Sequence, residues 1–288
     1  MTAYEDAPGQ VERVKRYYDR NTAQFRRLGE GGASIHRAVW APGSATLEQA
    51  VHHADDAVLS LLQGVQRPRV VDLGCGVGGS LIHLARCRPD LVGEGITISP
   101  AQAQLAVALV AEAGVGDRVR VREADFVAPP ADLTGADAAL SIEAFVHGPD
   151  PAGYFRAAAG VLAPGGVLVV CDDVLTAAGA AAAGGEARRI AEFRTGWRLA
   201  SLLPVEELTG HAAAAGLVPV GDEDLTPYLR LQRPRDRWLR LMVASTRPLR
   251  FRSEYWGSLA GGDALRFCLE RGLVSYRLLV FRRSAGGP

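Results

Sequence analysis

A glycine-rich turn between a buried strand and a helix constrains this chain more than any other feature. Residues 70–80 read Val-Val-Asp-Leu-Gly-Cys-Gly-Val-Gly-Gly-Ser, and an apolar helical pattern follows. Glycine adopts positive φ and lets a ligand approach the backbone without a Cβ in the way. A strand, a glycine-rich turn and a helix N-terminus together form a nucleotide-binding crevice in α/β proteins. The first three glycines do not follow the dinucleotide spacing G-x-G-x-x-G, although Gly79 leaves that pattern open.

An acidic residue, Asp72, lies two positions before the first glycine and gives the turn the pattern D-x-G-x-G-x-G. This pattern resembles the first motif of class I S-adenosylmethionine-dependent methyltransferases; the alternative is a generic glycine-rich turn. The resemblance implies an α/β, Rossmann-like sheet of seven mostly parallel strands, with S-adenosylmethionine as the methyl donor. It implies donor contacts from Asp72, Gly74, Cys75 and Gly76, with the Asp72 carboxylate near the cationic methionine end.

Two later strand ends carry further parts of the same resemblance. The segment Thr97-Ile98-Ser99-x-x-Gln102 follows a predicted strand over 91–97. It is similar to the cyclopropane-synthase, sterol and tocopherol branch of the family, where strand-end residues and the glutamine hold the ribose. Asp125 and Phe126 follow a predicted strand over 118–123 and resemble the pair that binds adenine.

A fourth predicted strand, over 136–142, contributes Ser141 to the expected donor site and leads into the segment 143–150. That segment, E-x-x-x-H-x-P-D, resembles the corresponding part of sterol and tocopherol C-methyltransferases. The resemblance implies that Glu143 stabilises a carbocation or removes a proton; the alternative is that it only orients the cap or the donor. Cyclopropane synthases carry a glutamate just before the histidine, where this chain has Val146, which argues against cyclopropanation.

The N-terminal part predicts a helical cap over residues 1–64, followed by a core over 65–288. A helix is expected over 10–28, and a His-containing segment ending in Trp follows it, which resembles the substrate-covering cap of small-molecule methyltransferases. The candidate catalytic residues are Glu143, His147 and Tyr18. The candidate substrate residues are Tyr17, His36, Trp40, Phe145, Trp197 and Tyr228. Tyr17, Tyr18 and Trp40 would equally suit packing of the cap onto the core.

Several other elements follow from periodicity. A second helix is expected over 46–63, and helical insertions around 177–203 and 226–272. A turn with the sequence Pro-Gly-Gly at 164–166 precedes a fifth strand, and a last strand over 273–281 is expected antiparallel at the sheet edge. The segment His-His-Ala-Asp-Asp at 52–56 is interpreted as a solvated face rather than a metal site, because adjacent helical histidines point about 100° apart.

The composition of the chain limits the classes of partner that it could bind. The 288 residues carry a net charge of zero, so no global field attracts nucleic acid or an anionic membrane. No run approaches the ~18 apolar residues of a membrane span, no secretion signal is evident, and the four cysteines form no C-x-x-C pair, which predicts a cytoplasmic protein. Exposed aromatic residues in the N-terminal helix favour a homo-oligomer. Arginines crowd residues 230–252 and form either a solvated surface or a diphosphate clamp, and Mg²⁺ is expected only with a diphosphate substrate.

These features predict a methyltransferase of bacterial specialised metabolism that C-methylates an isoprenoid alkene, either a prenyl diphosphate or a prenylated metabolite. Two alternatives stay open. One is O- or N-methylation of a small secondary metabolite, and the other is a protein that binds the donor without transferring methyl.

Overall fold

The computed structural model describes residues 9, 12, 14–15, 36–231 and 254–285, with the backbone alone for residues 254–256 and 258. Tyr17, Tyr18, most of the helix expected over 10–28, and the arginines between 233 and 252 lie outside the described residues. Within the described part, no helix is both long and apolar enough to cross a membrane. Three of the four thiols are buried, and Cys87 is exposed.

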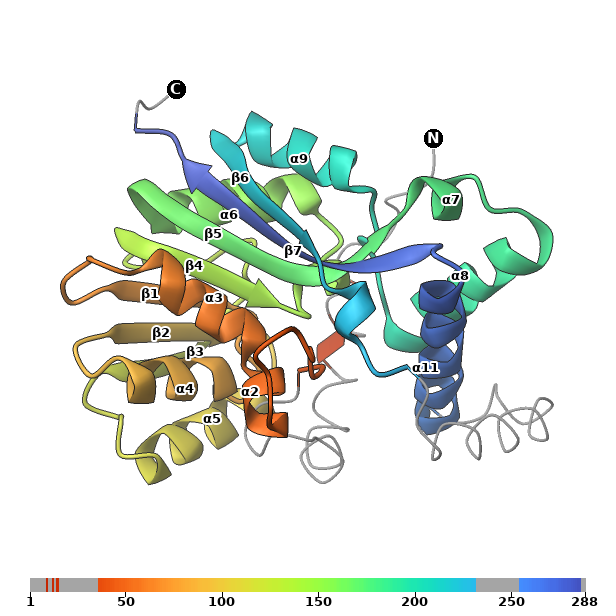
Figure 1. Ribbon diagram of the computed structural model, residues 1–288. Coiled ribbons are helices and arrows are strands. Elements are labelled where there is room, and N and C mark those ends of the chain that lie inside the picture. The colour runs from red at the N-terminus through yellow and green to blue at the C-terminus, as the bar shows by residue number, and fades with distance from the viewer. Residues whose placement is uncertain (1–8, 10–11, 13, 16–35, 232–253, 286–288) are drawn as a thin grey trace.

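A single seven-stranded sheet organises the molecule, in the order β3-β2-β1-β4-β5-β7-β6 (Figure 1). Strands β1 to β5 run parallel to one another, and β7 runs antiparallel to both β5 and β6. The strands are β1 (Arg69–Leu73), β2 (Val92–Thr97), β3 (Val119–Glu123), β4 (Ala136–Ile142), β5 (Leu162–Leu175), β6 (Leu217–Asp224) and β7 (Val274–Arg283). This confirms the predicted Rossmann-like, mostly parallel sheet.

The last strand corrects one prediction, because β7 is not at the edge. It lies between β5 and β6. Most of its side chains are buried, which suits an interior strand, whereas β6 buries little beyond Leu217 and exposes Val218 and Val220. A proline and three consecutive acidic residues in β6 suit an edge strand, since they discourage pairing with another chain.

Helices cover both faces of the sheet. Figure 1 shows α3, α4 and α5 on one face and α6 and α9 on the other. The helices are α2 (Leu47–Val51), α3 (His53–Leu61), α4 (Gly79–Cys87), α5 (Pro100–Glu112), α6 (Pro151–Val161), α7 (Ala177–Ala180), α8 (Gly184–Trp197), α9 (Val205–Ala214) and α11 (Glu254–Glu270), with 3-10 turns η1 (Phe145–His147) and η2 (Thr226–Tyr228).

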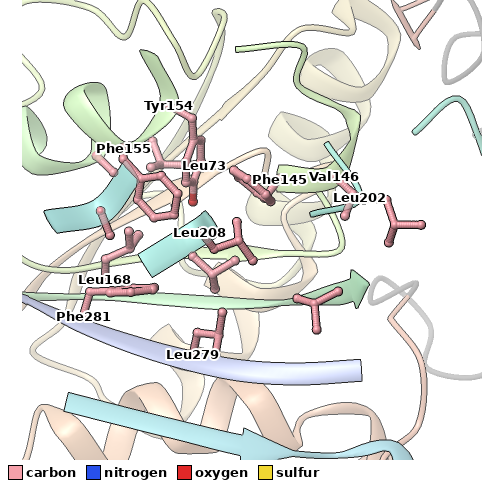
Figure 2. Packing of buried hydrophobic residues seen from close by; sticks show 14 of the residues in the cluster. Leu73, Phe145, Val146, Tyr154, Phe155, Leu168, Leu202, Leu208, Leu279 and Phe281 are labelled. Carbon is pink, nitrogen blue, oxygen red and sulfur yellow. The ribbon is translucent and has the colours of Figure 1, made fainter. Parts of the chain in front are cut away.

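Strand alternation divides the buried side chains between these two faces. Val70 packs with Val58 and Leu62 on the α3 face, whereas Leu73 packs with Tyr154 of α6 on the other face (Figure 2). Because successive strand residues point to opposite faces, the face of each strand-end side chain can be assigned in the same way.

The order of the strands reverses beside β1, because the chain passes from β1 to β2 on one side and returns to β4 on the other. In open α/β sheets, ligands bind at such a switch point, outside the carboxyl ends of the strands. The residues that end β1 and β2, among them the predicted donor residues Asp72 and Thr97, lie at this position.

The helix expected over 46–63 is two helices. Thr46 caps α2 in a capping box with Gln49, and the chain departs from helical geometry at His52 before α3 begins. The helical insertion expected around 177–203 begins with the short helix α7, which Thr176 caps through the backbone N–H of Gly179.

Helices α8 and α11 cross at unusually close range. A Cβ on Gly196 of α8 would lie 2.6 Å from the carbonyl oxygen of Gly257 and 2.6 Å from the Cα of Gly261. An ion pair between Arg189 and Asp263 also joins the two helices. Glycine at position 196 therefore sets the distance between two helices of the predicted insertions.

We expect Gly196→Ala to destabilise the protein by about 1–3 kcal/mol, because the added methyl group overpacks this crossing. Thermal unfolding measures the effect, at roughly 2–4 °C per kcal/mol for a domain of this size. Gly210→Ala in α9 is the matched control: nothing lies within 4 Å of its Cβ position, and alanine there should raise Tm. Unchanged stability of Gly196→Ala would contradict the close crossing.

Candidate active site

The glycine-rich turn has the backbone that its sequence predicts. Gly74, Gly76 and Gly78 all have positive φ, at 99°, 54° and 83°. A Cβ on Gly74 would lie 2.5 Å from the Cβ of Ala144, so glycine lets the segment after β4 pack directly against the turn. The donor turn and Glu143 are thereby brought to the same end of the sheet.

Asp72 ends β1 on the face covered by α3, since it alternates with Val71 and shares the face of Val70. Its side chain is 3% exposed. No donor in the described part of the chain hydrogen-bonds to it. Burial raises the pKa of Asp72 well above its usual value, and the nearby charge of Asp55 raises it further. A buried carboxylate without a partner at a ligand-binding sheet end suits a cationic ligand.

Cys75 follows in the same turn and is nearly buried. A Cβ on Gly95 would lie 2.7 Å from its sulfur, so the thiol packs against the backbone of β2. Burial raises the pKa of the Cys75 thiol, with the charge of Asp72 adding to the effect. The thiol is therefore a packing group beside the donor turn.

The end of β2 holds the predicted ribose-binding residues. The hydroxyl of Thr97 donates to Oε1 of Gln102 at 2.8 Å, and Ser99 caps α5 through the backbone N–H of Gln102. The amide nitrogen of Gln102 lies 3.9 Å from the Cβ position of Gly76, so this side chain reaches the glycine-rich turn. Ile98 is half-buried beside them.

The predicted adenine pair lies after β3. Oδ1 of Asp125 accepts the backbone N–H of Val127 at 3.0 Å, which fixes the turn. The Phe126 ring packs edge-on against Tyr154, with centroids 5.3 Å apart. A Cβ on Gly148 would lie 2.8 Å from this ring, so the segments after β3 and β4 meet at Phe126.

Ser141 does not join this group. Its side chain is fully buried and lies on the face of α6, against Tyr154. Strand alternation turns its hydroxyl into the core, one residue before the end of β4, and its contact with the donor stays a prediction.

Glu143 is the first residue after β4 and has a backbone φ of 52°. Non-glycine residues rarely adopt this conformation, and strain of this kind often accompanies functional positions. One carboxylate oxygen, Oε1, accepts three hydrogen bonds: from the backbone N–H of Arg37 at 2.9 Å, from Nε of Arg37 at 3.1 Å and from the hydroxyl of Tyr276 at 2.9 Å. The side chain remains 20% exposed, so part of it is accessible.

Arg37 connects Glu143 to a second carboxylate. Its two terminal nitrogens donate to the two oxygens of Asp173 on β5, at 2.9 and 3.0 Å. Its guanidinium also lies 3.9 Å from the ring centre of Tyr276 on β7. This fork geometry suits a carboxylate and is unavailable to lysine. The segment around residue 37 is thus fixed to the ends of β4, β5 and β7.

The arginine sets the charge of this cluster. Burial alone would raise the pKa of Glu143, but the charge and hydrogen bonds of Arg37 outweigh it, and the pKa is lowered. Burial raises the pKa of Asp173 despite its arginine contacts. Glu143 is therefore an ionised, partly accessible carboxylate, and a weaker proton acceptor than an ordinary glutamate.

His147 has a structural environment. Burial lowers its pKa to about 4, although contacts with the backbone of Arg198 and Trp197 and the charge of Glu143 act in the opposite direction. The imidazole is neutral at physiological pH, and it links η1 to the end of α8. A base with so low a pKa is poorly matched to proton abstraction near neutrality, so we assign His147 an orienting role.

The predicted substrate residues divide into core and site residues. Phe145 is 2% exposed and packs against Tyr154 and Phe155, which is the environment of a core residue (Figure 2), and its role toward the substrate stays a prediction. Trp40 is half-buried, and Arg230 lies 3.3 Å above its ring.

The other three predicted substrate residues in the described part of the chain are His36, Trp197 and Tyr228. His36 is half-buried, with Nε2 3.0 Å from the hydroxyl of Ser80. Trp197 packs on Phe193 at the end of α8. Tyr228 binds the segment containing Trp40 through its backbone, because its carbonyl accepts the Trp40 N–H at 2.9 Å.

Sequence reasoning missed Arg37, Asp173 and Tyr276. The acidic pair at 172–173, at the carboxyl side of a predicted strand, was the available signal. In the segment 52–56, which we expected to be a solvated face, Asp55 is fully buried, whereas Asp56 is exposed. Within the described residues, no three or more histidine, cysteine or acidic side chains are grouped to hold a metal ion.

The environment of Asp72 predicts a pH-dependent stability. A carboxyl pKa raised by folding stabilises the folded state at low pH, and this contribution is lost as pH rises through the folded-state pKa. Asp72→Asn removes no donor contact, so the unliganded variant should melt a few degrees above wild type at pH 8, with the difference shrinking toward pH 5.

Thermal unfolding at the two pH values measures this difference. Asp132→Asn is the control, because hydrogen bonding to Arg122 lowers the pKa of that exposed carboxylate, and its replacement should not stabilise. Lower stability of Asp72→Asn at both pH values would contradict the assigned environment.

Comparison with known proteins agrees with this geometry. Residues 46–220 match the family described as "Methyltransferase domain". The chain is 33% identical over 199 residues to 27-O-demethylrifamycin SV methyltransferase of Amycolatopsis mediterranei, covering 69% of this chain and 72% of that protein. It is 33% identical over 156 residues to cycloartenol-C-24-methyltransferase of Arabidopsis thaliana, covering 54% of this chain and 45% of that protein.

A solved structure has a similar fold. Geranyl diphosphate C-methyltransferase from Streptomyces coelicolor, in complex with Mg²⁺, geranyl diphosphate and S-adenosyl-L-homocysteine, superposes with a TM-score of 0.70 at 20% identity. The match covers 96% of this chain and 99% of that one. The glycine-rich turn, the residues at the ends of β2 and β3, and these matches together show that the chain belongs to the class I S-adenosylmethionine-dependent methyltransferases.

Proposed function

We propose that this enzyme methylates a carbon atom of an isoprenoid alkene, through a carbocation that is quenched by proton loss. The observation that carries the proposal is the state of Glu143. Arg37 and Tyr276 hold this carboxylate ionised at the carboxyl end of β4, with a strained backbone that fixes its direction. An ionised carboxylate of lowered pKa suits the stabilisation of positive charge.

The chemistry of the two substrates determines what the protein must do. The donor supplies an electrophilic methyl group on a positively charged sulfur. The chain's residues hold the alkene in line with that methyl group and exclude water, and such positioning can supply up to about 7–11 kcal/mol of the rate enhancement. Thr97, Gln102, Asp125 and Phe126 would hold the nucleoside side of the donor, and Asp72 its amino-acid side.

Methyl transfer to the alkene moves two electron pairs. The alkene π pair forms the new C–C bond, and the C–S pair returns to sulfur, leaving S-adenosylhomocysteine and a cation on the neighbouring alkene carbon. The negative charge of Glu143 stabilises that cation. A C–H bond beside the cation breaks, its electron pair forms the new double bond, and the proton passes to Glu143 or to a water that it binds.

A weak base suffices for that last step, because a proton beside a carbocation is very acidic. Deprotonating an alcohol before methyl transfer is different, since it is most efficient with a base whose pKa lies near the working pH. The lowered pKa of Glu143 therefore favours the alkene over a hydroxyl acceptor that would depend on this carboxylate.

The names of two similar proteins support a carbon acceptor. These proteins are a geranyl diphosphate C-methyltransferase and a cycloartenol-C-24-methyltransferase. If the substrate is a diphosphate, the arginine-rich segment 230–252 would bind it together with Mg²⁺. Arg230, the first of these arginines, is exposed above Trp40 at the edge of the described region.

O-methylation is the second candidate, and His36 favours it. This imidazole lies beside Ser80, and its charge would act on Glu143. His36 would accept the hydroxyl proton, and the ionised Glu143 would stabilise the resulting imidazolium. The name of the rifamycin relative, which specifies a 27-O-demethylated acceptor, is consistent with this chemistry.

An acceptor screen with two variants separates these candidates. S-adenosylmethionine is incubated with a panel of prenyl diphosphates and a panel of prenylated aromatics and phenols, and products are scored by mass and by the bond formed. We expect a gain of one methylene unit at carbon on an isoprenoid chain. Methyl transfer to oxygen alone would contradict the proposal.

Glu143→Gln should then lower kcat by about 100-fold or more, because a buried charge near the cation is lost, while S-adenosylhomocysteine binding is retained. His36→Gln should keep most of the C-methylation and would abolish O-methylation. Near-normal turnover of Glu143→Gln would remove Glu143 from the mechanism, whichever atom is methylated.

A further inference from the structure

A second buried carboxylate lies near Asp72 and belongs to no part of the site described so far. Asp55 of α3 is 0% exposed. Its Oδ2 lies 2.6 Å from Nδ1 of His52, but Oδ1 is buried and has no hydrogen-bond partner in the described part of the chain. An unpaired buried oxygen of this kind is costly unless a ligand completes its hydrogen bonding.

The two carboxylates face the same region. Asp72 lies on the sheet face that α3 covers, where Val70 packs with Val58 and Leu62. Asp55 is also the charge that acts on Asp72. Two like charges held near each other away from water repel, and a cation between them would relieve the repulsion. Arg37 performs this function for Glu143 and Asp173, but no arginine or lysine of the described residues reaches Asp55 or Asp72.

The position of Asp55 is fixed by a stack of imidazoles. The rings of His52 and His83 are parallel, with centroids 3.7 Å apart. Nε2 of His83 lies 2.8 Å from Oδ1 of Asp56. This contact joins α3 to α4, the helix that begins at the glycine-rich turn, whereas Asp55 itself is held by Nδ1 of His52.

We propose that Asp55 is a positioning residue for the methyl donor, binding its α-ammonium group together with Asp72. The inference rests on S-adenosylmethionine being the donor. The ammonium carries three N–H donors and one positive charge, which match two carboxylates with unfilled acceptor positions. The other cation of the donor, the sulfonium, must face the acceptor and is therefore unavailable for this role.

A metal ion is the competing occupant. A hard cation requires several oxygen ligands, typically six or more. Among the described residues around Asp55 and Asp72, no group of three histidine, cysteine or acidic side chains could hold a metal ion. The ammonium group therefore fits the pair better.

Binding calorimetry with two ligands tests the proposal. S-adenosylhomocysteine is compared with its analogue in which hydrogen replaces the α-amino group, on wild type and on Asp55→Asn. We expect the substitution to weaken S-adenosylhomocysteine by about 10- to 100-fold, as for a lost hydrogen bond to a charged group, and to leave the deamino analogue within about twofold.

Asp56→Asn is the matched control, since Asp56 is adjacent but exposed and bonded to His83, and neither ligand should bind it differently. Equal weakening of both ligands by Asp55→Asn would show a structural role and overturn the inference. Unchanged affinity for S-adenosylhomocysteine would also overturn it while leaving the donor assignment intact. Failure of wild type to bind S-adenosylhomocysteine would overturn the donor assignment itself.

Thermal unfolding confirms that each variant is folded. Should Asp55→Asn not fold, Asp72→Asn gives the same readout, because its carboxylate has no donor to lose. A loss confined to S-adenosylhomocysteine supports the ammonium site, and an equal loss for both ligands contradicts it.

Discussion

The guanidinium of Arg37, held between Glu143 and Asp173, is the interaction on which the acceptor side of the site depends. It compensates two carboxylates at the ends of β4 and β5 and ties residues 36–41 to the sheet. Removing one partner of such a buried network typically costs about 3–5 kcal/mol, because the remaining charges stay buried and unpaired. The same contact keeps Glu143 ionised. The charge of this candidate catalytic group therefore depends on the packing of the segment around Arg37 against the sheet.

The donor side shows the opposite arrangement. Asp55 and Asp72 are buried without an arginine or lysine among the described residues to compensate them, and we propose that the ligand supplies the missing positive charge. Gly74 connects the two sides, because the absence of its Cβ lets the segment after β4 approach the donor turn. Arg37 compensates the carboxylates on the acceptor side, whereas the bound donor would compensate those on the donor side. Donor binding would therefore stabilise the packing of the segments at this end of the sheet.

The order of motifs along the sequence brings most of the candidate donor residues to one end of the sheet, whereas less of the candidate acceptor site could be predicted. Asp72, Thr97, Gln102 and Asp125 end or follow consecutive parallel strands, so local pattern alone brings them to one edge. The face on which the Ser141 side chain lies is set by the alternation of residues along β4. Phe145 lies in a 3-10 turn, and its side chain is buried in the core. The role of Arg37 could not be predicted, because its partners Glu143 and Asp173 lie 106 and 136 residues away in the sequence and its own segment has no periodic pattern. The position of β7 inside the sheet could not be predicted without knowing that its side chains are more buried than those of β6.

The most direct test of this account is a carbon-13 NMR titration of the Glu143 carboxyl group, assigned by its absence from the Glu143→Gln spectrum. The account predicts a midpoint below the ordinary glutamate value of about 4.3, because the charge and donors of Arg37 outweigh burial. A midpoint near or above about 6 would contradict it. Glu143 would then be a general base for a hydroxyl acceptor, and the arginine would not control its charge.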